Sequence, residues 1–266
     1  MTAEGMQRSG AGTVARRRPM SLWRLERLRL LRSRRLVVLL GVFTFFGLTG
    51  PMLARYMGEL LERFGGGVTV TVPEPVPADG ITQYLANSSQ IGVLVVLVVA
   101  AGALAFDATP ELAAFLRART PVRRLLMPRY VLSVLAAGTA FTVGMLAAWY
   151  ETQVLLGGLP VGAMLVGIGL SWLYLAFAVA VVAVASALTR SVLATVALSA
   201  GLLIALPIVG VVEPLRRWLP SHLVGAPDAL LRGAAAADYT MAALATAAAT
   251  VGLLLAAVRM LRRREL

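Results

Sequence analysis

Residues 106–130 read FDATPELAAFLRARTPVRRLLMPRY and lie between two long apolar runs of the chain. Thr109 is a favourable N-cap, Pro110 fits the first helical position, and Glu111 fits the positive end of the helix dipole. Four residues then recur at helical spacing on one face: Leu112, Phe115, Leu116 and Arg119. The stretch therefore predicts a short helix of residues 110–119, ending before Pro121, in a loop between two membrane spans.

The apolar face of this predicted helix has to be covered by something outside the hydrocarbon core. It either lies on the bilayer surface as an interfacial helix or docks on a partner protein. Five arginines lie on and after the predicted helix, and their charge is compatible with both alternatives. They are Arg117, Arg119, Arg123, Arg124 and Arg129.

Composition places the whole chain in the membrane class. Of its 266 residues 59% are hydrophobic, and the mean hydropathy is +0.81, beyond what soluble domains carry. The chain has no cysteine, which excludes disulfides, thiolate metal sites and a cysteine nucleophile. All 25 basic residues are arginine, and the net charge is +12.

The N-terminal region is basic and precedes the first apolar run. Residues 1–19 predict a disordered basic tail, and residues 20–266 predict one six-span domain. Within that domain Ser21–Arg35 predicts an interfacial helix, because Trp23 favours the headgroup level and long arginine side chains can reach water from there.

Apolar runs of roughly 20 residues, the length that a bilayer core requires, predict six spans and hence an all-α fold. We expect Gly50–Pro51 to end or kink the first span, an amphipathic helix to follow over residues 54–64, and Asp79 to cap the helix that enters the second. The predicted spans are Leu36–Leu53, a second ending near Phe106, Tyr130–Tyr150, Val161–Leu188, Val192–Val212 with a kink at Pro207, and Tyr239–Val258.

Arginine placement predicts the orientation of these spans. The side that carries the termini, the 106–130 loop and Arg190 holds 20 arginines, whereas the other side holds Arg55, Arg63, Arg216, Arg217 and Arg232. The positive-inside rule then places both termini in the cytoplasm. The charge is explained by topology and by attraction to anionic membrane lipid, and no aromatic platform for single strands is present, so we expect no nucleic-acid partner.

Chemistry that would make the chain an enzyme is missing. The charged residues Asp107, Glu151, Arg190 and Glu213 all fall at span ends, so no mid-membrane carboxylate is available for proton or sodium coupling. The only histidine, His222, lies in an outer segment, which argues against a catalytic pair with a serine of the spans and against a metal site. There is no phosphate-binding GxxxxGK[ST] motif. We therefore expect no catalytic residue and no cofactor in this chain.

Four consecutive polar residues mark the second span near its outer end: Asn87, Ser88, Ser89 and Gln90. They are a possible lining for a translocation path. The simpler interpretation is that they mark entry into the headgroup region, because four consecutive residues point all round a helix.

With the spans placed, the chain resembles the six-span membrane subunits, or permeases, of type 2 ABC exporters. The interfacial helix Ser21–Arg35 resembles the family's connecting helix, and Pro110–Arg119 resembles its coupling helix. Pro121, Val122 and Arg123 are similar to the family's turn into the third span, and Glu213–Asp238 resembles its re-entrant region. The long outer segment 54–90, and Pro128 in place of a usual glycine, depart from the family pattern.

The resemblance implies a dimer of permease chains, identical or different, with two separate ATP-binding cassette subunits that bind ATP and Mg²⁺. It implies export of an amphipathic or lipid-like molecule across the inner (plasma) membrane of a prokaryote. The residues that would couple to the ATPase are Glu111, Leu112, Phe115, Leu116 and Arg119. A secondary carrier or lipid flippase without an ATPase, and a non-transporting membrane anchor for a cytoplasmic protein, are the alternatives.

The predicted orientation can be tested with single cysteines, since the chain has none of its own. Thr71→Cys should react with a membrane-impermeant thiol reagent added outside cells, because residues 65–79 are predicted to be external. Ala118→Cys should react only after permeabilisation. The reverse labelling pattern would refute the orientation.

Overall fold

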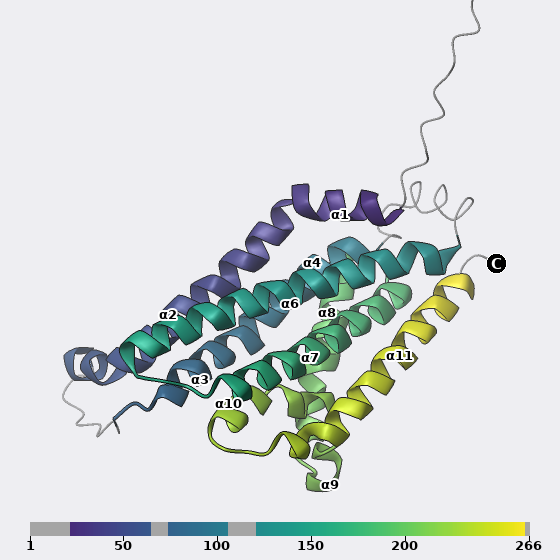
Figure 1. Ribbon diagram of the computed structural model, residues 1–266. Helices are drawn as coiled ribbons and strands as arrows, with labels where there is room; N and C mark the ends of the chain where they lie inside the picture. The colour runs from purple at the N-terminus through teal and green to yellow at the C-terminus, as the bar shows by residue number, and fades with distance from the viewer. Residues whose placement is uncertain (1–21, 65–73, 106–120, 264–266) are drawn as a thin grey trace, which may run out of the picture.

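The computed structural model describes residues 22–64, 74–105 and 121–263, and nearly all of them are helical (Figure 1). Six helical segments are long and apolar enough to cross a membrane. They are Arg34–Leu61, Pro77–Leu104, Val122–Leu155, Val161–Leu188, Val192–Val209 and Ala236–Arg263. By length and composition the six predicted spans are confirmed, and the chain is a multi-pass membrane protein. The basic tail and the predicted helix 110–119 lie outside the described residues.

Each span is built from one long helix or from consecutive shorter ones. The elements are α1 (Leu22–Arg32), α2 (Arg34–Phe64), α3 (Pro77–Asn87), η1 (Ser88–Gly92), α4 (Val93–Leu104), α6 (Val122–Leu155), α7 (Val161–Leu188), α8 (Val192–Val209), α9 (Glu213–Arg216), η3 (Pro220–Leu223), α10 (Ala226–Leu231), η4 (Ala236–Tyr239) and α11 (Thr240–Arg263). The second span is α3, η1 and α4 in direct succession, with a π-helical turn at η1.

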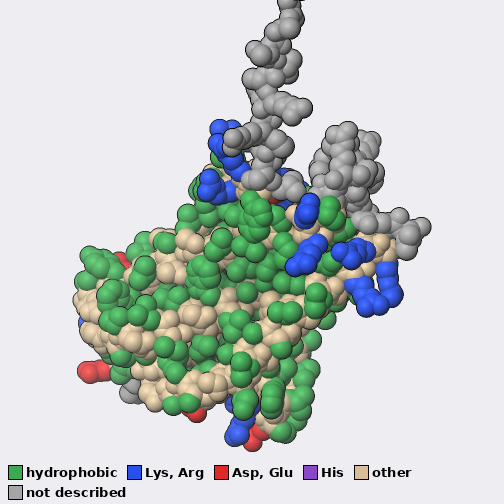
Figure 2. Space-filling view, turned by 45° about the vertical axis from the view of Figure 1, so that its right-hand side comes forward, with side chains coloured by type: hydrophobic (Ala, Val, Ile, Leu, Met, Phe, Trp, Pro, Cys, Tyr) green, Lys and Arg blue, Asp and Glu red, His purple; other side chains and the backbone are tan. Residues whose placement is uncertain are grey.

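The two ends of the bundle differ in what they carry. Helix α1 lies across the end of the bundle towards which the last turns of α11 also run, whereas α9 and α10 lie at the opposite end (Figure 1). Hydrophobic side chains cover the middle of the bundle, and arginines gather at the α1 end (Figure 2). The first and last described helices thus begin and end on the same side, as an even number of spans requires. The predicted interfacial helix exists as α1, with a bend at Ser33 before α2 begins.

The prediction that the first span ends near Leu53 and is followed by a separate amphipathic helix is wrong. Helix α2 continues through Pro51 to Phe64 and absorbs the predicted amphipathic helix. Pro51 removes only one backbone hydrogen bond, and tertiary packing can compensate such a loss within a membrane bundle. Here Pro51 is buried, and a Cβ placed on Gly80 would stand 3.2 Å from the Pro51 Cβ. Contact with α3 therefore holds the helix together at the proline.

The second and third spans also begin earlier than predicted. Asp79 does not occupy the N-cap position, since α3 starts at Pro77 and Asp79 lies in its first turn. It still caps the helix, because its Oδ2 accepts a hydrogen bond from the Val76 backbone N–H at 2.9 Å. Helix α6 starts at Val122 rather than Tyr130, and its 34 residues span about 51 Å, longer than a bilayer core of about 30 Å.

Helix α6 extends through Pro128 because its first turns are packed against the bundle. Leu125 and Leu126 are buried. The Tyr130 hydroxyl donates to the Ala176 carbonyl of α7 at 3.0 Å, which fixes the following turn. The helix therefore begins eight residues before the predicted start at Tyr130.

The remaining boundaries follow the sequence more closely. Helix α7 has the predicted bounds, and the tight turn after it is closed by Ser191, whose Oγ accepts from the Ala194 backbone N–H at 3.1 Å. Helix α8 includes Pro207 as expected but ends at Val209, three residues before the predicted Val212. Helix α11 continues five residues past the predicted Val258, to Arg263.

The core of the bundle depends on close backbone contact between α2 and α6. A Cβ built on Gly47 would stand 2.2 Å from the Gly144 carbonyl oxygen, and one built on Gly144 would stand 2.5 Å from the Phe43 carbonyl oxygen. Tyr84 of α3 fits beside this contact, fully buried, and its hydroxyl donates to the Phe141 carbonyl at 2.8 Å. Small residues let the two helices approach closely, as is common for association within membranes.

This contact predicts a strong difference between two glycines of the same helix. Gly47→Ala should force α2 and α6 apart and destabilise the protein by about 1–3 kcal/mol, because overpacking leaves no low-strain arrangement. Gly41→Ala is the matched control, since a Cβ at Gly41 meets nothing within 4 Å. Thermal unfolding in detergent should show a lower midpoint for Gly47→Ala only. Equal midpoints would contradict the close contact.

Candidate functional site

The segment between α8 and α11 forms a folded cap on the end of the bundle opposite α1 (Figure 1). It consists of four short helical turns, and three of them carry proline in their first two positions, where the missing N–H costs no hydrogen bond. Leu223, Leu230 and Tyr239 are its buried anchors. They pack with Ala163, Leu170, Leu173 and Tyr174 of α7. The predicted outer segment is thus a compact structure with its own small core.

The cap packs closely against α7 at a glycine of that helix, Gly167. A Cβ built on Gly167 would stand 2.9 Å from the Cβ of Pro227, so only glycine permits this approach of α10. The Ser171 hydroxyl, one turn along, donates to the Gly167 carbonyl at 2.9 Å and is buried. Ser171 therefore has a structural hydrogen bond within its own helix.

Charged side chains join the cap to the start of the second span. The Arg232 Nη2 lies 2.9 Å from Asp79 Oδ1, and its Nε lies 3.1 Å from Asp228 Oδ1. Thr82 of α3 donates to Asp228 and accepts from Arg232 Nη2 at 3.0 Å. The hydrogen bonds that Arg232 donates to Asp79 and Asp228, with the negative charge of both carboxylates, raise the pKa of Arg232. One guanidinium thereby holds α10 against α3.

Below the cap is a groove of about 970 Å³ between the second span and α8. Its apolar wall comes from both helices, and Leu94 and Ile204 at its edge are exposed. Its polar end is formed by cap residues, among them Arg216, His222 and Asp228. Further lining residues are Ser89, Gln90, Val93, Leu97, Tyr174, Ala200, Leu203, Pro207, Gly210, Ser221, Val224, Gly225, Ala229 and Tyr239. The groove thus offers an apolar surface that ends in charged and polar groups.

The polar quartet of the second span lies at this groove but does not act as a unit. Ser88 is 2% exposed, and its hydroxyl donates to the Leu85 carbonyl at 3.3 Å. Ser89 and Gln90 line the groove, whereas Asn87 does not. The four residues straddle the junction between α3 and the π-helical turn η1, a distortion often found at functional sites. Gly92 fits there because a Cβ would stand 2.9 Å from the Phe43 ring.

His222 belongs to the polar end of the groove. Its ring stacks on Tyr239, with centroids 4.8 Å apart and planes 25° from parallel. Burial and the nearby charge of Arg216 lower the pKa of His222, while Asp238 acts in the opposite direction. The imidazole is therefore neutral at pH 7 and able both to donate and to accept a hydrogen bond. Within the described part of the chain, no group of three or more acidic or histidine side chains is placed to hold a metal ion.

The structure adds functional candidates that sequence reasoning missed. Arg216, Asp228 and Tyr174 come together with Ser89 and Gln90 only because the cap folds back over α7. The proline-rich cap sequence signalled short helices but not the surface they cover. The predicted coupling residues all fall outside the described residues; they are Glu111, Leu112, Phe115, Leu116 and Arg119.

No protein-family model, curated protein or solved structure matches the chain.

The charged network predicts how firmly the cap is held. Arg232→Gln should increase the labelling rate of a cysteine placed at the buried Ala226 about fivefold, because losing these partly exposed ion pairs costs about 1 kcal/mol. Arg217→Gln, at an exposed position of the same segment, is the control with the same charge change. Labelling of Ala226→Cys by an impermeant maleimide would measure both. Equal rates would show that the network does not restrain the cap.

Proposed function

We propose that the chain is a permease subunit of an ATP-driven exporter of the type 2 ABC class. The outer groove is, in this proposal, part of the path for an amphipathic or lipid-like molecule. ATP and Mg²⁺ are bound and used by a separate ATP-binding cassette subunit, present in two copies, and the chain itself is not an enzyme. The complex lies in the inner (plasma) membrane of a prokaryote.

The groove between the second span and α8 is the observation that carries the proposal. Its apolar wall and exposed edge residues Leu94 and Ile204 give an apolar tail access from the lipid side. Its polar end, with Arg216, His222 and Asp228, offers partners for a headgroup or other polar part. A volume of about 970 Å³ is at the upper end of the range for small-molecule sites, about 300–1,000 Å³.

The distribution of charge supports an external source of energy. Among the side chains that the structure describes, the carboxylates of the spans lie towards span ends: Glu59 near the end of α2, Asp79 in the first turn of α3, Glu151 near the end of α6, and Asp238 at the start of the last span. An ion-coupled carrier generally holds its ion on polar groups near the bilayer midplane. The proposal therefore assigns the driving force to ATP, delivered through the helix predicted at residues 110–119.

A second permease chain completes the path in this proposal. Helix α8 packs little of its surface within the chain, and the exposed side chains Leu193, Ile204 and Ile208 lie along it. A second copy, or a different permease, would cover this helix and close the open side of the groove. Lipid covers the remaining apolar surface.

Filling the groove should stop transport without unfolding the protein. Ala200→Phe places a ring in the lining of the groove, so transport by the assembled complex in vesicles should fall at least tenfold. Ala248→Phe is the matched control, because Ala248 is an exposed residue of α11 that does not line the groove. Transport that is equally active in both variants would remove the groove from the path.

The predicted coupling helix provides an independent test of the motor. If residues 110–119 dock on the ATPase, Phe115→Ala removes a buried aromatic anchor and costs about 2–4 kcal/mol, roughly a 30- to 1,000-fold loss in binding. Arg119→Ala, at the expected rim of the contact, should do much less. Co-purification of the ATPase in detergent measures both. An ATPase retained equally by wild type and Phe115→Ala, with transport unchanged, would remove the coupling role from this helix.

A further inference from the structure

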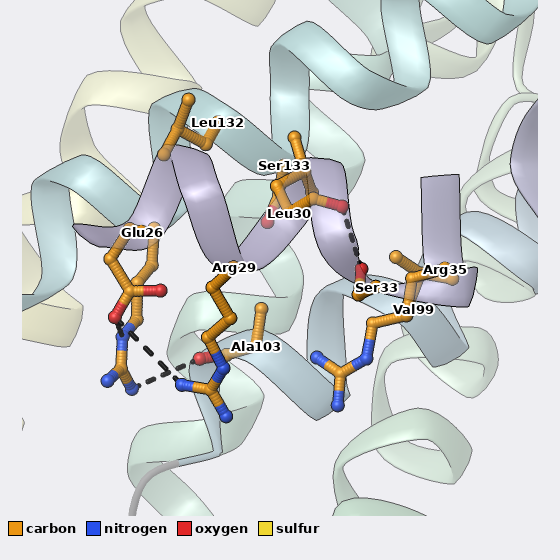
Figure 3. A pocket seen from close by; sticks show the side chains of 10 residues that line it. Glu26, Arg29, Leu30, Ser33, Arg35, Val99, Ala103, Leu132 and Ser133 are labelled. Carbon is orange, nitrogen blue, oxygen red and sulfur yellow. Dashed lines mark hydrogen bonds and ion pairs between the residues drawn. The ribbon is translucent and has the colours of Figure 1, made fainter. Parts of the chain in front are cut away.

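A small cavity lies at the opposite end of the bundle from the groove, where α1 crosses the helices (Figure 3). Its volume is about 130 Å³, and it lies between α1, the start of α2, the end of α4 and the start of α6. The lining residues are Glu26, Arg29, Leu30, Ser33, Arg35, Val99, Ala103, Arg129, Leu132 and Ser133. Since drug-sized ligands occupy about 300–1,000 Å³, this cavity suits a single small polar group.

The cavity carries an excess of positive charge. Three guanidinium groups, those of Arg29, Arg35 and Arg129, face one carboxylate, that of Glu26, which leaves two positive charges uncompensated. The carboxylate is already engaged, because Glu26 Oε1 lies 2.7 Å from Arg129 Nε and 4.0 Å from Arg29 Nη1. Arg129 is only 8% exposed and also donates to the Ala103 carbonyl at 3.3 Å. The Glu26–Arg129 pair thus forms a fixed wall.

Because Glu26 pairs with Arg129, the guanidinium of Arg35 in the same cavity is available to bind a ligand. Its guanidinium lies against α4, where a Cβ built on Gly102 would stand 3.1 Å from Nη2. It is half-buried, and among the described residues it makes neither an ion pair nor a hydrogen bond. The side chains of Arg29 and Arg35 extend in the same direction from α1 and the start of α2 (Figure 3). Two guanidinium groups so placed can bind the oxygens of one anion in a forked geometry.

The position of the cavity identifies the class of anion. It lies at the arginine-rich end of the bundle (Figure 2). Beside it is α1, whose Trp23, Leu25 and Leu31 are exposed. Exposed Trp and arginine side chains are typical of the headgroup level of a membrane. Immediately towards the membrane centre, Val38 of α2 and Val98 of α4 expose apolar side chains. A polar cavity that adjoins an apolar surface at this depth matches a phosphate group that carries acyl chains.

We propose that this cavity binds the phosphate of an anionic phospholipid, with Arg29 and Arg35 as the phosphate ligands and Glu26–Arg129 as the pair that holds the cavity open. The bound headgroup joins α1 to the bundle by neutralising the arginines on both sides. The lipid is a structural ligand distinct from any cargo in the outer groove, which lies at the other end of the molecule. The inference does not depend on the proposed function.

The test measures lipid binding directly. Purified protein is titrated with phosphatidylglycerol, and in parallel with phosphatidylcholine, and the bound lipid is counted by native mass spectrometry. Arg35→Gln should weaken phosphatidylglycerol binding about tenfold, because a charge-assisted contact is lost. Arg34→Gln, the adjacent exposed residue outside the cavity, removes the same charge and should leave binding unchanged.

A second pair of variants covers the case in which Arg35→Gln fails to fold. Arg29 is 53% exposed, so Arg29→Gln is tolerated by the fold, and it should weaken phosphatidylglycerol binding as well. Arg27→Gln, on the exposed face of α1, is its control. Equal losses in variant and control, or equal affinity for phosphatidylcholine, would overturn the proposal. Displacement of the lipid by millimolar inorganic phosphate would also overturn it, since the site would then be one for a free anion.

Discussion

The backbone contact between Gly47 of α2 and Gly144 of α6 sets the geometry on which the rest of the bundle depends. It brings the two helices close enough for Tyr84 of α3 to reach the Phe141 carbonyl, and this hydrogen bond fixes the second span against both. The second span then carries Gly92 against Phe43 and turns Ser89 and Gln90 towards the groove below the cap. A single close approach in the core thus determines which polar side chains face the groove.

The two ends of the molecule use charge in different ways. At the end with the cap, Arg232 lies between two carboxylates, those of Asp79 and Asp228, so its charge is more than compensated and its role is to hold the cap. At the end with α1, Glu26 matches only part of the arginine charge, and Arg35 is left to a ligand. An arginine whose charge is compensated by carboxylates joins two protein segments, whereas excess positive charge at headgroup depth recruits an anion from the membrane.

Much of the fold could be predicted from the sequence because lipid demands long apolar helices. Helix α7 has the predicted bounds, since Pro160 and the turn at Thr189 limit an uninterrupted apolar run. Pro51 misled the prediction, because tertiary packing holds α2 intact where a local rule would end the helix. The groove could not be predicted, since Ser89 and Asp228 come together only through the folded cap. The cavity at Arg35 could not be predicted either, because in the sequence Arg35 is one of many arginines that indicate topology. Only the fold brings Gly102 and Glu26 to the same cavity.

We propose that a separate ATPase, rather than an ion gradient, supplies the energy for transport, and vesicles containing this chain with the proposed ATPase test this most directly. Export of an amphipathic reporter should continue after ionophores collapse the proton and sodium gradients, provided that ATP and Mg²⁺ are supplied on the ATPase side. Transport that stops when the gradients collapse and is indifferent to ATP would contradict the account.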